Sequence, residues 1–63
     1  MAYQDFRKKV QALVHKACFK AVFTCEDGRF FAYCSDGVVI IGNPLSTSVL
    51  VRWGSGHQAI AHI

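Results

Sequence analysis

Residues 19–41, FKAVFTCEDGRFFAYCSDGVVII, decide the fold, because two Asp-Gly pairs interrupt a run of residues that prefer strands. The first pair is Asp27-Gly28 and the second is Asp36-Gly37. Asp-Gly between strand-forming residues is the strongest short signal of a β-hairpin, since both central positions of its turn take a positive φ. The stretch therefore predicts three antiparallel strands joined by two tight turns.

Two-residue turns at both Asp-Gly pairs would determine which residues face each other. The first turn places Cys25 opposite Phe30, and the second places Ala32 opposite Ile41. Because side chains alternate between the faces of a sheet, this register predicts one apolar face and one half-apolar face. The apolar face comprises Phe19, Ala21, Phe23, Cys25, Phe30, Ala32, Cys34, Val39 and Ile41. The other face comprises Lys20, Val22, Thr24, Arg29, Phe31, Tyr33, Val38 and Ile40.

Residues 2–17 precede these strands and show a helical pattern. Their apolar side chains recur mostly every third or fourth residue, as in one stripe of an amphipathic helix. The stripe consists of Tyr3, Phe6, Val10, Leu13, Val14 and Ala17. Asp5 lies in the first turn and Lys16 in the last, which suits the helix macrodipole. We expect this helix to pack on the apolar face of the sheet.

Residues 42–63 continue the sheet. A loop at 42–45 is followed by a strand rich in β-branched residues, and a Gly-Ser-Gly turn at 54–56 precedes a last short strand. The whole chain is therefore expected to be one α+β domain, residues 1–63. An N-terminal helix packs on one face of an antiparallel meander of four to five strands. We expect the helix at about 2–17 and the strands at about 18–25, 29–35, 38–42, 46–53 and 57–63.

The composition excludes several classes of protein. Of 63 residues, 52% are hydrophobic and 17% are charged, which is unlike a disordered tail. A chain this short forms one domain and buries only about 60% of its unfolded surface, so self-association is a common source of extra stability. The formal charge of +3 favours anionic partners.

The cysteines and the hydrophobic runs bear on location. The odd number of cysteines, Cys18, Cys25 and Cys34, is unlike a disulfide-stapled secreted module. No run resembles a signal peptide or a membrane span. We therefore expect a cytoplasmic protein with reduced thiols and no membrane contact.

One helix cannot cover both faces of the predicted sheet. The half-apolar face would leave an apolar patch exposed, which is unusual for a monomer. We expect a homo-oligomer in which this face packs on another copy. The residues buried between subunits would be Val22, Phe31, Tyr33 and Ile40. The alternative is a monomer with a partly apolar open face.

Catalytic and metal-binding patterns are absent from the sequence. Asp27 and Asp36 are explained by turn chemistry, and no pair of carboxylates suggests acid–base catalysis. Ser55 precedes a histidine at position 57, but the strand–turn–helix setting of a nucleophile elbow is missing. The cysteine and histidine spacings match no zinc site. We expect a protein that is not an enzyme, with no metal and no cofactor.

Two segments favour binding of anions. The first joins a cation, a large ring and flexible glycines, which suit phosphate and base contacts; its site residues are Arg52, Trp53, Ser55, Gly56 and His57. The alternative is that this segment is only a hairpin turn. The second is the polar face of the helix, where anion contacts would come from Arg7, Lys8, Lys9 and Lys16. The alternative there is a solvated face.

These features favour a small, oligomeric, non-enzymatic protein that sequesters a small anionic ligand such as a nucleotide signal. One alternative is an inhibitor that docks on a host protein, and a second is a nucleic-acid binder that uses the basic helix. No motif assigns the chain to a family. In size, charge and lack of motifs it resembles the small accessory proteins of bacteriophages. That resemblance implies an anti-defence role, either inhibition of a host factor or sequestration of a signalling molecule.

Overall fold

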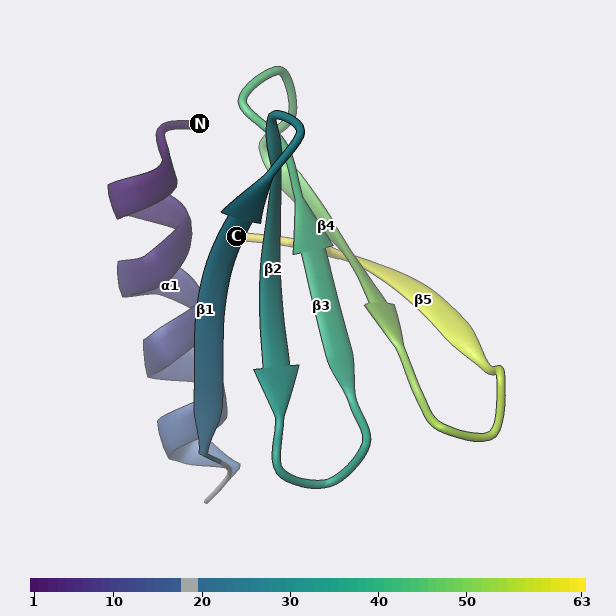
Figure 1. Cartoon of the computed structure of the whole chain (residues 1–63). Helices are drawn as coiled ribbons and strands as arrows, with labels where there is room; N and C mark the ends of the chain where they lie inside the picture. Colours follow the sequence, from purple (N-terminus) through teal and green to yellow (C-terminus); the bar gives the residue numbers. More distant parts are fainter. Residues whose placement is uncertain (18–19) are drawn as a thin grey trace.

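The computed structural model describes residues 1–17 and 20–63 and shows one helix beside one sheet (Figure 1). All five strands run antiparallel to their neighbours, in the order β1-β2-β3-β4-β5. The expected α+β architecture is confirmed, with shorter elements than predicted. The elements are α1 (Tyr3–Lys16), β1 (Ala21–Glu26), β2 (Arg29–Cys34), β3 (Val39–Gly42), β4 (Ser48–Arg52) and β5 (Gln58–His62). Cys18 and Phe19, expected in the first strand, lie outside the described residues.

Helix α1 packs on β1 and β2. Phe6, Val10 and Val14 are buried, in agreement with the predicted stripe, whereas Leu13 at the edge of the stripe is 43% exposed. The Phe6 ring lies 5.4 Å from the Phe30 ring, centroid to centroid, and forms the centre of the aromatic core. The helix has Ala2 as its N-cap residue, and this residue makes no side-chain capping hydrogen bond. Its stability therefore comes from the buried stripe rather than from capping.

The first hairpin has the predicted geometry. Asp27 has a φ of 51° and Gly28 a φ of 72°, as a two-residue type I′ turn requires. Cys25 consequently faces Phe30 and Phe23 faces Ala32. The prediction of the β1–β2 register is confirmed.

The second hairpin differs from the prediction by one residue. The N–H of Cys34 donates to the carbonyl oxygen of Val38 at 2.8 Å, which closes a three-residue loop. Gly37 alone in this loop has a positive φ, 76°. Ala32 therefore faces Ile40 rather than Ile41. Because side chains alternate along a strand, this slip turns every residue of β3 to the other face.

Because of this one-residue slip, four residues lie on the opposite face of the sheet from the one predicted. Val38 and Ile40 are each 5% exposed and belong to the core against α1, so their predicted place on the opposite face is wrong. Ile40 is therefore not available to an interface on that face. Val39 and Ile41, predicted to face the helix, lie on the side of the sheet away from it.

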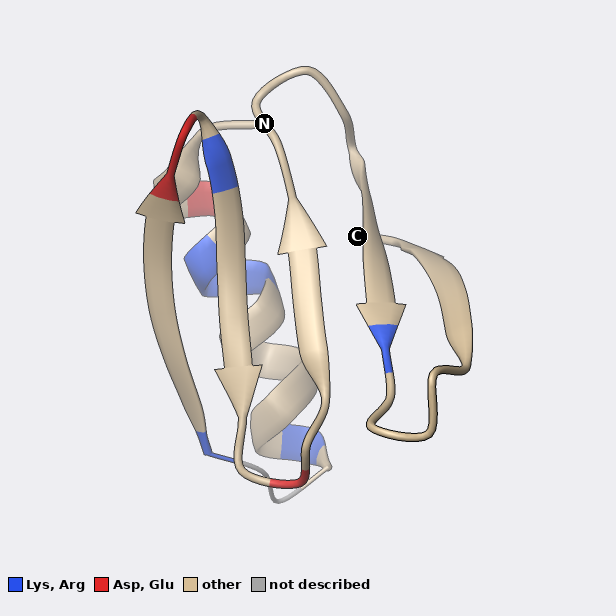
Figure 2. Cartoon of the chain, turned by 45° about the vertical axis from the view of Figure 1, so that its right-hand side comes forward, with Lys and Arg blue, Asp and Glu red and all other residues tan. Residues whose placement is uncertain are grey.

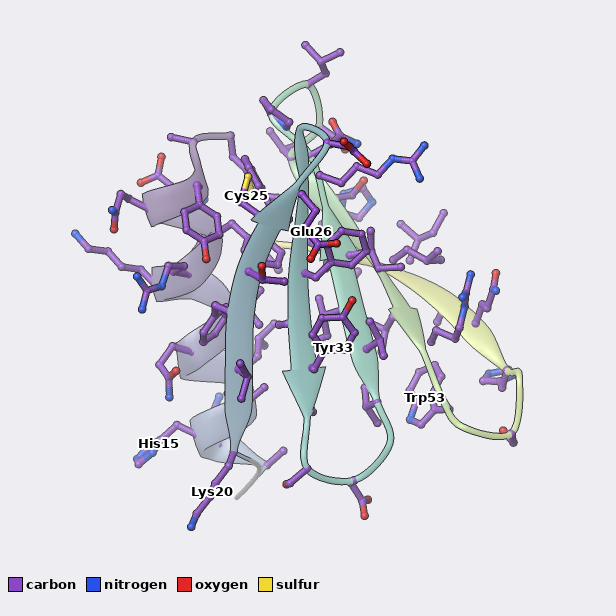
Figure 3. All side chains as sticks on the ribbon, in the orientation of Figure 1. His15, Lys20, Cys25, Glu26, Tyr33 and Trp53 are labelled. Carbon is purple, nitrogen blue, oxygen red and sulfur yellow. The ribbon has the colours of Figure 1, made fainter. Side chains whose placement is uncertain are left out.

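We call this side of the sheet, which α1 does not cover, the open face. Figure 3 shows Glu26 and Tyr33 in front of the strands, on this side. Val22, Tyr33 and Ile60 are 70%, 46% and 71% exposed, so the face is largely apolar and accessible. Its residues, read from the strand register, are Val22, Thr24, Glu26, Arg29, Phe31, Tyr33, Val39, Ile41, Ser48, Leu50, Arg52, Gln58, Ile60 and His62.

Among the described residues, no helix has the length and apolar character that crossing a membrane requires.

Candidate functional site

The Arg52–His57 segment forms the hairpin between β4 and β5. The N–H of Trp53 donates to the carbonyl oxygen of His57 at 2.9 Å, and the N–H of Gly56 donates to that of Trp53 at 2.9 Å. Gly56 has a φ of 94°, a conformation that favours glycine. Ser55 lies exposed in the turn. Because the Gly56 N–H is already paired within the turn, it is not a donor for an anion.

The side chains of this segment separate onto two sides of the sheet. Arg52 lies on the open face, where its Nε is 3.1 Å from the side-chain amide of Gln58, which accepts in the orientation that satisfies both groups. The ring centroid of Trp53 is 5.1 Å from that of His57. Trp53 also borders a small apolar pocket of about 180 Å³ beside Leu13 of α1. The five predicted site residues thus do not converge on one site.

Arg52 instead borders a recess of about 470 Å³ on the open face. Arg29 borders the same recess from the start of β2. The floor between them is apolar and includes Ile41, Leu50 and Ile60. A recess of this volume with an apolar floor and a few polar groups has the character of a small-molecule site.

Three polar side chains complete the rim of the recess, Asn43, Ser46 and Ser48. The Oδ1 atom of Asn43 accepts the N–H of Leu45 at 2.8 Å, so the NH₂ group is the part of this amide that can serve a ligand. The two serine Oγ atoms lie 3.0 Å apart, and that of Ser46 also accepts the N–H of Ser48. The rim is therefore held in shape by local hydrogen bonds and offers donors to an anion.

The basic residues of α1 are exposed and separate from this recess. Figure 2 shows positive positions on α1, at the start of β2 and at the end of β4. Arg7 lies over two aromatic rings, with its Cζ atom 5.8 Å from the Tyr3 centroid and 5.6 Å from the Phe23 centroid. Lys8, Lys9 and Lys16 are exposed. The predicted anion contacts of the helix thus form a second basic surface, without convergence on the recess.

The thiol of Cys34 gives no sign of a nucleophile. Burial raises the pKa of the Cys34 thiol, which disfavours the reactive thiolate form. The residues that the structure describes contain no group of three or more His, Cys, Asp or Glu side chains that could hold a metal ion.

Sequence reasoning missed Arg29, Asn43, Ser46 and Ser48 as site residues. Arg29 had a usable signal, because strand alternation places it on the same face as Tyr33. The other three depend on the path of the 43–47 loop and on the β3–β4 register, which no turn motif specifies. Arg52 is the one predicted ligand-binding residue that borders the recess.

The fold and the recess together define a small α+β protein with one helix-covered sheet face and one open, arginine-bordered sheet face. No family model, no curated protein and no solved structure matches this chain.

Proposed function

We propose that this chain is a small non-enzymatic binding protein that sequesters an anionic ligand of nucleotide size in the recess of the open face. Arg29 and Arg52 would contact the phosphate groups, and the apolar floor would take the base. The resemblance to phage accessory proteins makes sequestration of a nucleotide signal, in an anti-defence role, the biological form of this proposal.

The observation that carries the proposal is that two arginines, Arg29 and Arg52, border one recess with an apolar floor. Guanidinium groups bind phosphate with two parallel hydrogen bonds, and they do so most strongly where water is partly excluded. With the Gln58 amide in the orientation that satisfies both groups, Arg52 donates to its oxygen, and this contact would order part of the Arg52 side chain before a ligand binds. The formal charge of +3 further favours an anion over a cation.

Calorimetric titration with nucleoside triphosphates and cyclic dinucleotides tests the proposal. Loss of a charge-assisted hydrogen bond costs about 1.5–3 kcal/mol, so Arg29→Ala and Arg52→Ala should each weaken binding about 10- to 150-fold. Arg7→Ala is the matched control, since Arg7 is an exposed arginine on α1, away from the recess, and its loss should leave the affinity unchanged. Absence of binding to every nucleotide tested would overturn the proposal.

The two alternatives predict different results. A host-protein inhibitor would form a stoichiometric complex with a protein and bind no nucleotide. A nucleic-acid binder would depend on Arg7, Lys8, Lys9 and Lys16, and its affinity would fall steeply with salt concentration. In that case the Arg7→Ala control would weaken binding more than Arg29→Ala.

A further inference from the structure

Strand β5 is an edge of the sheet, and it lacks the features that usually protect an edge. Its sequence, QAIAH, contains no Lys, Glu, Asp, Arg or Pro. Natural edge strands are commonly blunted by charges, prolines, bulges or covering elements, because unpaired backbone groups invite another strand. Ile60 at the centre of β5 is 71% exposed. Unlike most edges, β5 therefore presents an uncharged strand to solvent.

The other edge, β1, is protected. Lys20 precedes it and Glu26 ends it, so charges flank its apolar centre. Helix α1 packs behind the face of β1 and β2 (Figure 2), and Arg7 of α1 lies over the ring of Phe23. In Figure 2 β5 lies to the right of β4, and no described element lies to the right of β5. The contrast points to β5 as the edge that is open to pairing.

The hydrogen bonds of the β4–β5 hairpin show which backbone groups of β5 point outward. The N–H of Trp53 donates to the carbonyl oxygen of His57, and the N–H of Ile63 donates to that of Thr47. The odd-numbered residues of β5 therefore form the backbone hydrogen bonds with β4. Antiparallel strands alternate between inward- and outward-facing backbone groups. The N–H and C=O groups of Gln58, Ile60 and His62 therefore point away from β4.

These outward groups are arranged so that β5 complements itself. A two-fold axis through Ile60 places Ile60 opposite Ile60 of a second copy and Gln58 opposite His62 of a second copy. Every outward N–H then meets an outward C=O, with two hydrogen bonds at each of the three residue pairs. No like charges face each other, and amide–imidazole pairs lie on both sides of the central apolar pair.

We infer that two copies of this chain join through β5 in this register and form one continuous antiparallel sheet. The contact is isologous, so it closes as a dimer and does not propagate. It leaves the open face uncovered. Ile60 also lines the recess, so the two recesses of a dimer would lie next to each other across the axis. The inference does not depend on the proposed function, since it rests on the strand edge alone.

The mass of the chain in solution, without ligand, tests this pairing. Light scattering should show a rise from 7.0 kDa toward twice that mass as the concentration increases. Ile60→Lys would place two like charges at the axis and should hold the chain at the monomer mass. Val22→Lys is a matched control, because Val22 is 70% exposed and lies on the same face at the opposite edge. The Val22→Lys variant should dimerise as the wild type does.

Hydrogen exchange at single amides gives a second readout that requires no variant. The N–H groups of Ile60 and Phe23 both point outward, one from each edge of the sheet. Exchange at Ile60 should slow as the concentration rises, while exchange at Phe23 stays constant. A chain that remains at 7.0 kDa near millimolar concentration, with fast exchange at Ile60 throughout, would overturn the inference. Loss of the dimer in Val22→Lys as well would also overturn it, in favour of contact through the open face.

Discussion

Arg29 of β2 and Arg52 of β4 border the same recess, although a full hairpin and a long loop separate them in the chain. The β2–β3 and β3–β4 ladders bring them together, and both lie on the face that α1 leaves open. Both side chains are cations, so the recess that they border favours an anionic ligand over a cationic one. The candidate site is therefore a product of strand register rather than of any contiguous motif.

Gly42 lies so close to the Phe6 ring that a larger residue at this position would clash with it. A Cβ atom there would lie 2.9 Å from the Phe6 ring, so Gly42→Ala should lower the free energy of unfolding by about 1–3 kcal/mol through overpacking. Urea denaturation followed by circular dichroism measures this change. Gly54→Ala is the control, because the nearest atom to its Cβ lies at 3.8 Å. Equal stability of the two variants would contradict this packing.

Phe31 distinguishes contact through the open face from contact through β5. Its ring stacks on Tyr33, with centroids 5.9 Å apart, in the middle of the open face. If subunits met there, Phe31→Asp would give a monomer or an unfolded chain, as the interface predicted from the sequence (Val22, Phe31, Tyr33 and Ile40) implies. With pairing through β5, light scattering should find the same dimer mass in Phe31→Asp as in the wild type.

The same position also probes the charge requirement of the recess. Phe31 lines a neighbouring hollow together with Arg29, so an added carboxylate there should weaken nucleotide binding by about 0.5–1 kcal/mol, or roughly two- to fivefold. Phe31→Asn removes the ring without adding the charge and separates the two effects. Calorimetry should therefore find weaker binding in the Asp variant than in the Asn variant, and equal affinities would argue against an anionic ligand.

The two described thiols should react at different rates. Cys25 is exposed, whereas Cys34 is partly buried and its Sγ lies 3.9 Å from the carbonyl oxygen of Ala32. Since burial raises the pKa of Cys34, iodoacetamide at mildly alkaline pH should label Cys25 first, because the thiolate is the reactive form. Peptide mapping by mass spectrometry measures both rates. Faster labelling of Cys34 would show that its site is open to solvent.

The same shift has a consequence for stability in alkaline solution. The unfolded chain loses the Cys34 proton at lower pH than the folded chain does, so the free energy of unfolding should fall as the pH rises through this range. Below it the thiol is protonated in both states and contributes nothing. Cys34→Ala should flatten this decline, and an unchanged pH profile in that variant would assign the decline to other groups.

The two Asp-Gly hairpins show how far the sequence predicts the fold. At Asp27-Gly28 both residues take a positive φ, so the two-residue turn and its register follow from the motif. At Asp36-Gly37 only Gly37 does so, and the loop closes one residue wider, between Cys34 and Val38. The motif alone does not distinguish these loops, because either accepts Gly at its last position. Packing distinguishes them, since the wider loop buries Ile40 against the helix.

The candidate site was less predictable than the fold. Arg52 was identified from local chemistry, but Trp53 and His57 pack against each other beside the sheet instead of joining it. The β2–β3 and β3–β4 ladders bring Arg29 to the same recess as Arg52. The registers of these ladders depend on the wide β2–β3 loop and on the 43–47 segment. A site built by long-range register leaves no signature in any short window of sequence.

The binding of a nucleotide at the open-face recess is the central claim, and a two-dimensional ¹⁵N–¹H NMR titration tests it most directly. Addition of a cyclic dinucleotide should shift the amide signals of Arg29, Ile41, Leu50 and Arg52 in a saturable manner and leave those of Lys8 and Lys9 unchanged. Shifts confined to α1, or no shifts at millimolar ligand for any nucleotide tested, would contradict the claim.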